Sequence, residues 1–150
     1  MNIMKLFVGA VALSVSVVAQ ADVAVIVNSL NTQPVSESEV QQIFLGKRKD
    51  FADGTEATPY NLPKGAANRD TFNEVVLGKN PSRYEAYWAK LIFTGKGRPP
   101  AELDTDAAVI AAVGGDIGAI GYVDAESVNS SARVVMNSSV RVILEVPTGK

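Results

Sequence analysis

The chain has 150 residues with 14 basic and 16 acidic side chains, which gives a formal net charge of −2. It contains no Cys and no His, so disulfides, thiol and imidazole catalysis and the usual zinc and copper ligands are all excluded. The mild negative balance argues against nucleic acid or an anionic membrane surface as a partner. We therefore expect a protein that is not an enzyme and that carries no metal and no cofactor.

Residues 1–21 have the pattern of a secretory signal peptide. Lys5 gives a short positive start, an apolar run extends over residues 6–18, and Ala19-Gln20-Ala21 supplies the small residues of a cleavage site. The apolar run is shorter than the ~20 residues needed to span a bilayer. We expect cleavage after Ala21, a periplasmic location, a mature domain over residues 22–150, and no membrane-spanning segment after cleavage.

The first half of the predicted domain alternates strand and helix signals. Residues 23–27 form a continuous apolar run, which predicts a strand buried on both faces, as in a parallel sheet covered by helices. Ser36 and Glu39 have the spacing of a capping box at a helix start, and Gly46 suits the end of that helix. A short strand is predicted over residues 56–62.

Two helices are predicted next. Asn68 is the expected N-cap of a helix over residues 69–77, with Val75 and Val76 inward, and Asn80 with Pro81 opens the following helix. That second helix has a stripe of large apolar side chains at the spacing i, i+3, i+4, i+7, i+8: Tyr84, Tyr87, Trp88, Leu91 and Ile92. Such a stripe is more typical of a core-facing surface than of an aromatic ligand site.

The last third of the sequence predicts a helix, a strand and a hairpin. The helix covers residues 105–113 behind Asp104 as its cap, and the strand covers residues 118–123 with close backbone contacts at its glycines. Residues 132–136 and 140–146 are expected to pair as a terminal hairpin. Strands that alternate with helices predict a single α/β domain, in which a mixed sheet is flanked by helices in three layers.

Several segments, in this order along the chain, resemble the periplasmic phosphate-binding proteins of ABC transporters. They are VSESEVQQIFLG (35–46), GKRKDFADGTEATPYNLPKG (46–65), NRDTF (68–72) and GDIGAIGYV (115–123), and VLGKNPSRYEAYWAKLIFTGKGRPP (76–100) is more specifically similar to a short, stand-alone variety of the family. The resemblance covers about residues 23–125. It implies one lobe of a periplasmic binding protein type II fold, and a solute-binding module related to phosphate ABC transporter substrate-binding proteins.

The resemblance also marks an anion-binding segment, Lys64, Gly65, Ala66, Ala67, Asn68 and Arg69. In the family, backbone N–H groups at helix starts bind the phosphate together with loop hydroxyls. Here Ala66, Ala67 and Asn68 stand where Ser, Gly and Thr would be, so the hydroxyls are missing. A helix start with Lys64 and Arg69 remains, which implies weak binding of phosphate or another small oxyanion. Arg69 is expected to be exposed.

The same resemblance leaves a second function open. One lobe of a two-lobed protein exposes a face that was built to meet another lobe, so a protein partner or a homodimer is also expected. In that case the chain is an interaction or accessory module that has lost tight phosphate binding. The carboxylate pairs Asp50/Asp53 and Asp104/Asp106 sit at turns or helix starts, where Asp is expected for local hydrogen bonding rather than for catalysis.

Overall fold

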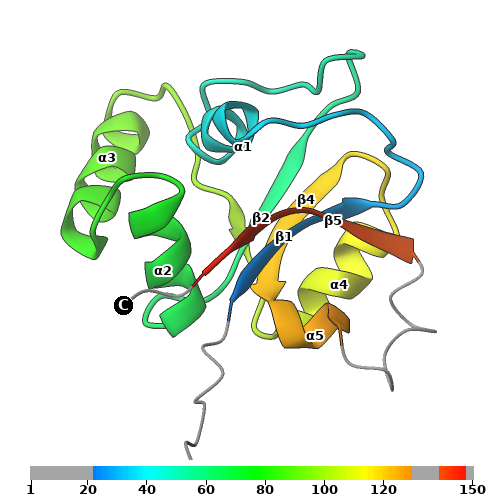
Figure 1. Ribbon diagram of the computed structural model, residues 1–150. Coiled ribbons are helices and arrows are strands. Elements are labelled where there is room, and N and C mark those ends of the chain that lie inside the picture. Colours follow the sequence, from blue (N-terminus) through cyan, green and yellow to red (C-terminus); the bar gives the residue numbers. More distant parts are fainter. Residues whose placement is uncertain (1–21, 130–138, 148–150) are drawn as a thin grey trace, which may run out of the picture.

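The computed structural model describes residues 22–129 and 139–147, and one five-stranded sheet forms its centre (Figure 1). The strands are β1 (Val23–Asn28), β2 (Thr58–Asn61), β3 (Ala101–Glu102), β4 (Ala119–Asp124) and β5 (Val140–Val146). Their spatial order is β3-β2-β4-β1-β5. Strand β2 is parallel to β3 and β4, whereas β1 is antiparallel to β4 and β5. The predicted mixed sheet is therefore confirmed.

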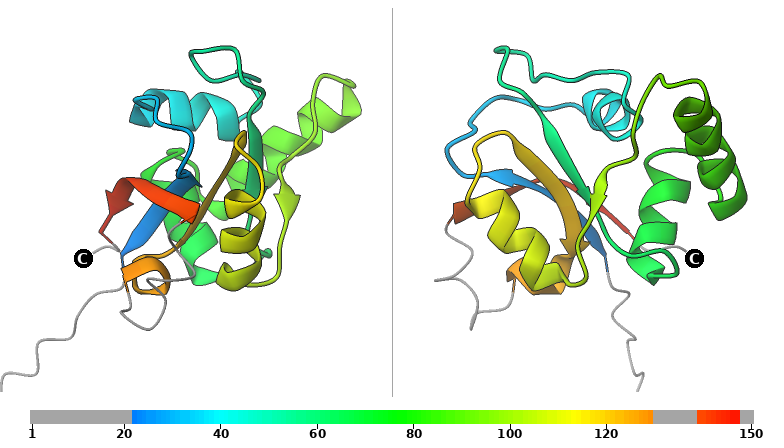
Figure 2. Two further views of the ribbon diagram at one scale, coloured as in Figure 1. Left: turned by 90° about the vertical axis from the view of Figure 1, so that its right-hand side faces the viewer. Right: turned by 180° about the vertical axis from the view of Figure 1, so that it is seen from behind.

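Helices cover both faces of this sheet. They are α1 (Glu37–Phe44), α2 (Ala67–Val75), α3 (Pro81–Phe93), α4 (Asp106–Gly114) and α5 (Ala125–Asn129). Two neighbouring residues of β4 show which helix lies where: a Cβ added at Gly121 would lie 2.5 Å from Val109 of α4, whereas the ring of Tyr122 stacks on Phe72 of α2 at 4.1 Å. Because successive residues of a strand point to opposite faces, α4 covers one face and α2 the other. Figure 2 shows these three layers from two further directions.

The strand β1 lies between β4 and β5, and all six of its residues are buried, as its apolar run predicts. The expectation of a parallel environment was wrong, since both neighbours of β1 run antiparallel to it. The physical reason is that burial on both faces requires only a helix layer on each side. A short apolar run records that burial and carries no information about the direction of the neighbouring strands.

Two of the four predicted helix caps are confirmed. The Ser36 hydroxyl accepts from the Glu39 N–H at 3.1 Å, and the Asn80 side chain accepts from the Arg83 N–H at 2.9 Å. The other two predictions were wrong by one or two residues. Thr105 rather than Asp104 caps α4, and α2 begins at Ala67 with no side-chain cap, which leaves Asn68 inside the first turn. For α4 the polar residue one position away satisfies the same sequence pattern, and α2 begins after the apolar Ala66 without any side-chain cap, so the pattern does not fix where a helix starts.

The outermost helix, α3, lies beyond α2 at the edge of the molecule (Figures 1 and 2). Tyr84 and Trp88 bury its inner face, but Ile92 is 56% exposed although the stripe predicted it inward. Val75 of α2 is likewise half exposed against expectation. Both residues lie in the last turn of helices at the edge of the fold. The helical spacing of apolar side chains continues there, but no core residues within the described ranges remain for them to pack against.

The end of the chain supplies the edge strand β5, which pairs with β1. Its predicted hairpin partner over residues 132–136 and the predicted signal peptide over residues 1–21 lie outside the described residues. Within residues 22–129 and 139–147, no helix combines the length and the apolar character that a membrane crossing requires.

Candidate functional site

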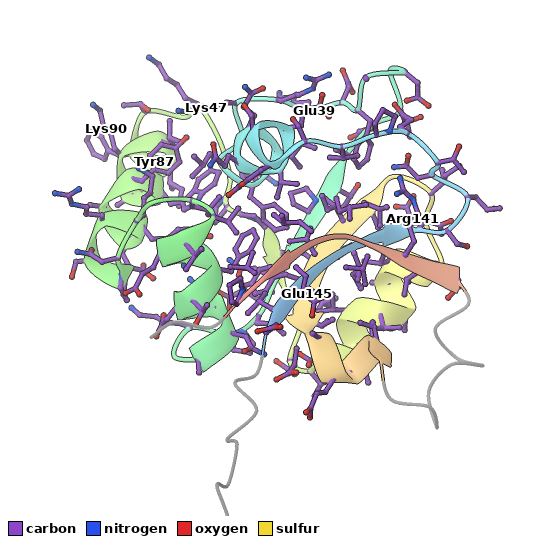
Figure 3. All side chains as sticks on the ribbon, in the orientation of Figure 1. Glu39, Lys47, Tyr87, Lys90, Arg141 and Glu145 are labelled. Carbon is purple, nitrogen blue, oxygen red and sulfur yellow. The ribbon has the colours of Figure 1, made fainter. Side chains whose placement is uncertain are left out.

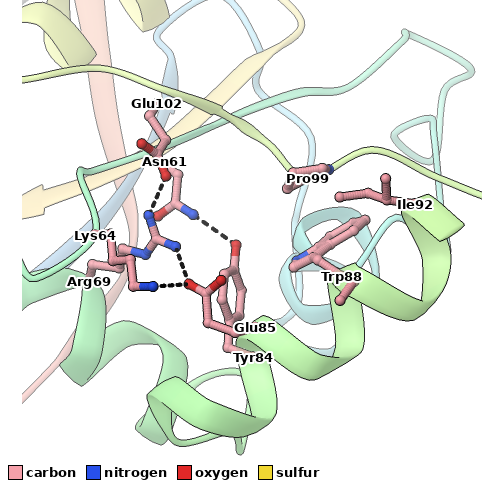
Figure 4. Close-up of a pocket in the computed structure, with 10 residues that line it drawn as sticks. Asn61, Lys64, Arg69, Tyr84, Glu85, Trp88, Ile92, Pro99 and Glu102 are labelled. Carbon is pink, nitrogen blue, oxygen red and sulfur yellow. Dashed lines mark hydrogen bonds and ion pairs between the residues drawn. The ribbon is translucent and has the colours of Figure 1, made fainter.

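A pocket of about 370 Å³ lies between α2, α3 and the ends of β2 and β3 (Figure 4). Its lining residues are Asn61, Lys64, Arg69, Tyr84, Glu85, Trp88, Ala89, Ile92, Pro99 and Glu102. Of the six residues predicted for anion binding, Lys64 and Arg69 line this pocket. The remaining four, Gly65, Ala66, Ala67 and Asn68, form the turn and the first residues of α2 outside it.

Arg69 is the buried cation of the pocket, with only 5% of its surface exposed. Its Nη1 donates to the carbonyl of Leu62 at 3.1 Å and to the carboxylate of Glu102 at 2.5 Å, and its guanidinium lies 5.1 Å from the centre of the Tyr84 ring. The expectation that Arg69 is exposed was therefore wrong. A residue in the first turn of a helix is exposed only if no other element covers it, and here β3 and α3 cover the side chain.

Glu85 of α3 joins this cation to a second one. Its Oε1 lies 3.5 Å from Nη2 of Arg69 and 3.7 Å from Nζ of Lys64, as the dashed lines in Figure 4 show. The Lys64 side chain is 74% exposed and that of Glu85 is 48% exposed. Glu85 thus makes two long, solvent-accessible contacts, whereas Glu102 makes one short contact. The Glu85 carboxylate is the more easily displaced of the two.

The start of α2 has backbone N–H groups that lack a hydrogen-bond acceptor in the described part of the chain. The Asp70 N–H bonds to the carbonyl of Ala66, but within the described residues the N–H groups of Ala67, Asn68 and Arg69 have no acceptor. Orphan amides at a helix start favour an anion, since they donate hydrogen bonds and carry the positive end of the helix dipole. These amides adjoin the pocket through Lys64 but do not line it.

A buried chain of polar groups lies behind the charges. Nδ2 of Asn61 donates to the Tyr84 hydroxyl at 2.8 Å, and the Tyr122 hydroxyl donates to Oδ1 of Asn61. The N–H of Leu62 donates to Tyr122 at 3.2 Å. Burial raises the pKa of both tyrosines, so both hydroxyls stay protonated near neutral pH. Sequence reasoning missed Asn61; the available signal was an amide side chain near the end of the short strand predicted over residues 56–62.

The opposite wall of the pocket is apolar and consists of Trp88, Ile92 and Pro99 (Figure 4). Trp88 is 4% exposed and Ile92 is 56% exposed, so the wall runs from the core to the surface of α3. A ligand in this pocket would contact charged groups on one side and apolar side chains on the other.

Sequence reasoning also missed the acidic members of the site, Glu85 and Glu102.

In each carboxylate pair considered from the sequence, one acid has a hydrogen-bonding role, which is local for Asp53 but joins distant segments for Asp106. Asp106 Oδ2 accepts from the Asp124 N–H at 3.0 Å and from the Ser127 hydroxyl at 2.6 Å. The N–H of Thr55 donates to Asp53 at 2.8 Å, and this hydrogen bond holds the pKa of Asp53 below its usual value. Among the described residues, no group of three or more acidic side chains could hold a metal ion.

Comparison with known proteins supports the fold. No protein-family model and no curated protein matches the chain. An ABC-type phosphate transport receptor from Vibrio cholerae matches with a TM-score of 0.61 and 14% identity, over 83% of this chain and 46% of the receptor. PstS from Borrelia burgdorferi matches with 0.61 and 10%, over 83% of this chain and 47% of PstS. A possible phosphate-binding protein from Planctomyces limnophilus matches with 0.59 and 15%, over 84% and 42%.

The chain therefore spans about half the length of these solved structures. At identities this low, the likeness establishes the shared fold. The resemblance expected from the sequence is confirmed at that level: the described residues have the fold of about one half of a phosphate transport substrate-binding protein.

Proposed function

We propose that this chain is an exported, non-catalytic solute-binding module that holds a small oxyanion, phosphate or a phosphate ester, between Lys64 and Arg69. The fold supports this proposal because its structural neighbours are described as phosphate receptors and phosphate-binding proteins. The observation that carries it is the position of the Glu85 carboxylate, which lies between one exposed and one buried cation. The Glu85 carboxylate occupies the position between the two cations that an external anion would take.

Binding would then be an exchange. An incoming oxyanion displaces Glu85 from its contacts of 3.5 Å and 3.7 Å, while the 2.5 Å contact with Glu102 keeps Arg69 in position. Glu85 is half exposed, so the displaced carboxylate returns to water at little cost. Competition from Glu85, together with the high effective dielectric of an open pocket, makes the affinity low.

The apolar wall favours an ester over the free ion. Trp88, Ile92 and Pro99 offer carbon surface opposite the cations, and free phosphate has nothing to place against it. A volume of about 370 Å³ falls in the ordinary range of small-ligand pockets. Phenyl phosphate, which has one charged and one aromatic end, is a suitable probe.

Calorimetry and thermal shift with inorganic phosphate and phenyl phosphate test the proposal. We expect binding on the order of millimolar for the native chain, which corresponds to about 4 kcal/mol, and a rise in melting temperature since the ligand binds the folded state. Glu85→Gln should strengthen binding because the competing charge is gone, and Lys64→Gln should weaken it. Glu74→Gln is the matched control, since Glu74 is an exposed acid of α2 that forms no ion pair with a described residue.

Two outcomes would contradict this proposed function. One is the absence of heat and of any thermal shift for both the native chain and Glu85→Gln. The other is an equal gain in affinity for Glu85→Gln and Glu74→Gln, which would reflect only the change in net charge.

Export is a separate part of the proposal. The pattern of residues 1–21 supports cleavage after Ala21 and delivery to the periplasm. Expression of the full chain in a bacterium, followed by osmotic-shock fractionation and mass spectrometry, should give a periplasmic product that begins at Asp22. A cytoplasmic product that retains Met1 or Asn2 would contradict export.

A further inference from the structure

The outward surface of α3 carries an aromatic residue that is almost fully exposed. Phe93 is 93% exposed and is the most exposed large apolar side chain among the described residues. Exposed Ala86 and Ala89 precede it by seven and four positions, so the three residues lie on one side of the helix. This apolar stripe, Ala86, Ala89 and Phe93, continues into the pocket, because Ala89 and the neighbouring Ile92 line it.

The Phe93 ring and the apolar wall of the pocket therefore lie on the same face of the molecule. A two-fold axis through this face can place the Phe93 ring of each copy against the pocket of the other. We propose that two copies of this chain associate through α3, with Phe93 of each packed against Ile92 and Pro99 at the mouth of the other's pocket.

The charges beside the stripe determine the direction of pairing. The spacing of Ala86, Ala89 and Phe93 is that of heptad positions a, d and a, which makes Glu85 a g position and Arg83 and Lys90 e positions. The stripe thus has an acidic edge and a basic edge. Lys90 and Arg83 are exposed and form no ion pair with a described residue, and Figure 3 shows Lys90 directed outward from α3.

A two-fold axis parallel to α3 exchanges the two edges but keeps each residue at the same height along the helix. The acidic edge of one copy then faces the basic edge of the other. Both contacts of Glu85 with Lys64 and Arg69 are made by Oε1, so its Oε2 can pair with Lys90 of the second copy, the g-to-e pairing of parallel coiled coils. An antiparallel arrangement would place Lys90 and Arg83 near the same residues of the other copy. Charge complementarity therefore selects parallel pairing.

The contact is small, since it involves one face of a 13-residue helix and the loop that carries Pro99. Interfaces below about 1,200 Å² are typical of weak complexes. The dimer is therefore expected to form over a micromolar to millimolar concentration range and to be in equilibrium with the monomer.

Sedimentation velocity of the mature chain from about 1 µM to 1 mM tests the proposal. We expect reversible dimers that Phe93→Ser abolishes and that Leu30→Ser leaves unchanged, since Leu30 is another exposed apolar residue, at 75%, in the loop after β1. Lys90→Glu and Glu85→Lys should each weaken association at least tenfold, and the double variant should restore it. Trp88 is the sole tryptophan and lies in the pocket, so its emission should change with protein concentration in the native chain but not in Phe93→Ser.

Cross-linking tests the direction. The chain has no Cys, so Ala86→Cys and Ala89→Cys each introduce a single thiol near the two-fold axis. Parallel pairing predicts that both variants form disulfide-linked dimers under oxidation, because each residue faces its own copy. An antiparallel pair would link at most the one residue at the crossing point.

A monomer throughout the range, or a dimer that Phe93→Ser leaves intact, overturns the proposal. So does Phe93-dependent binding of the monomer to phosphatidylglycerol vesicles, which would identify the surface as a lipid contact. All measurements are made without phosphate or phenyl phosphate, so a failure here leaves the proposed ligand site untouched.

Discussion

The guanidinium of Arg69 lies 2.5 Å from the carboxylate of Glu102, and this contact joins the first turn of α2 to the edge strand β3. Arg69 is 5% exposed, whereas half of the Glu102 side chain remains in contact with water. The guanidinium of Arg69 is thus buried, whereas its carboxylate partners Glu85 and Glu102 are half exposed at the surface. This asymmetry makes the two partners unequal in their effect on stability.

Arg69→Glu should lower the free energy of unfolding by about 3–5 kcal/mol, the usual cost of breaking a buried ion pair from one side. The variant places a third negative charge between Glu85 and Glu102, and it leaves the carbonyl of Leu62 without its donor. Urea unfolding followed by Trp88 fluorescence measures the change. Arg98→Glu makes the same change of charge at an exposed position and should cost less than about 0.5 kcal/mol. Equal costs for the two variants would show that Arg69 is not buried by its partners.

The sequence places Arg69 correctly in a helix start but gives the wrong exposure, and the reason is the distance along the chain. Glu102 is 33 residues away from Arg69, in a two-residue strand that has no periodicity of its own. Hydrophobic spacing records which side of a helix faces the core, so it identified Trp88 and Tyr84. Hydrophobic spacing does not indicate which acidic side chain pairs with which basic one, so the ion pairs of Arg69 with Glu85 and Glu102 were not predicted.

Trp88 and Phe93 provide a matched pair of large aromatic residues on one helix. Trp88 is 4% exposed and Phe93 is 93% exposed. Trp88→Ala should lower the free energy of unfolding by about 3–5 kcal/mol, as expected for a large core truncation. Phe93→Ala, measured by urea unfolding at low protein concentration, should change it by less than about 0.5 kcal/mol. A comparable loss for both variants would contradict the outward position of Phe93.

Tyr122 should make the protein sensitive to alkali. Burial raises the pKa of Tyr122 above the value of 10.0 that applies in the unfolded chain, so the folded state keeps its proton while the unfolded state loses it. The stabilisation is complete below about pH 10 and is lost as the pH rises from there toward the folded pKa, at about 1.4 kcal/mol per pH unit. Urea unfolding between pH 8 and pH 11 should show this decline.

Tyr122→Phe separates the hydrogen bonds of this hydroxyl from its titration. At neutral pH it should cost about 1–3 kcal/mol, because Asn61 loses a donor inside the protein. Above pH 10 its stability should decline less steeply than that of the native chain. Tyr60→Phe is the control, since the Tyr60 hydroxyl makes no hydrogen bond to a described residue. An unchanged alkaline slope in Tyr122→Phe would assign the decline to other groups.

The regular parts of the fold were the most predictable from the sequence. The buried strand β1 and the Ser36 and Asn80 caps depend on residues within a few positions of one another. The close contacts predicted at the glycines of residues 118–123 are also confirmed, since a Cβ would lie 2.1 Å from the carbonyl of Glu56 at Gly118, just before β4, and 2.5 Å from Val109 at Gly121 within it. The antiparallel direction of β1 and the exposure of Ile92 depend on where distant segments pack, so local patterns could not give them.

Gly46 and Gly95 end two helices in nearly the same left-handed conformation, with φ of 69° and 68°. A Cβ at Gly46 would lie 3.1 Å from the Trp88 ring, whereas a Cβ at Gly95 would have no atom within 4 Å. Gly95→Ala should therefore cost only the left-handed backbone penalty, about 1–2 kcal/mol. Gly46→Ala should cost more, because the indole must also shift within a packed core.

The difference between these two variants measures the contact with Trp88 directly, since the backbone term is common to both. In a Trp88→Leu background the smaller side chain leaves room at Gly46, so the costs of Gly46→Ala and Gly95→Ala should become equal. Urea unfolding of the six proteins, followed by far-ultraviolet circular dichroism, gives the comparison. If the extra cost at Gly46 persists after Trp88 is removed, the turn after α1 is constrained by its own backbone, and the indole of α3 does not pack over it as described.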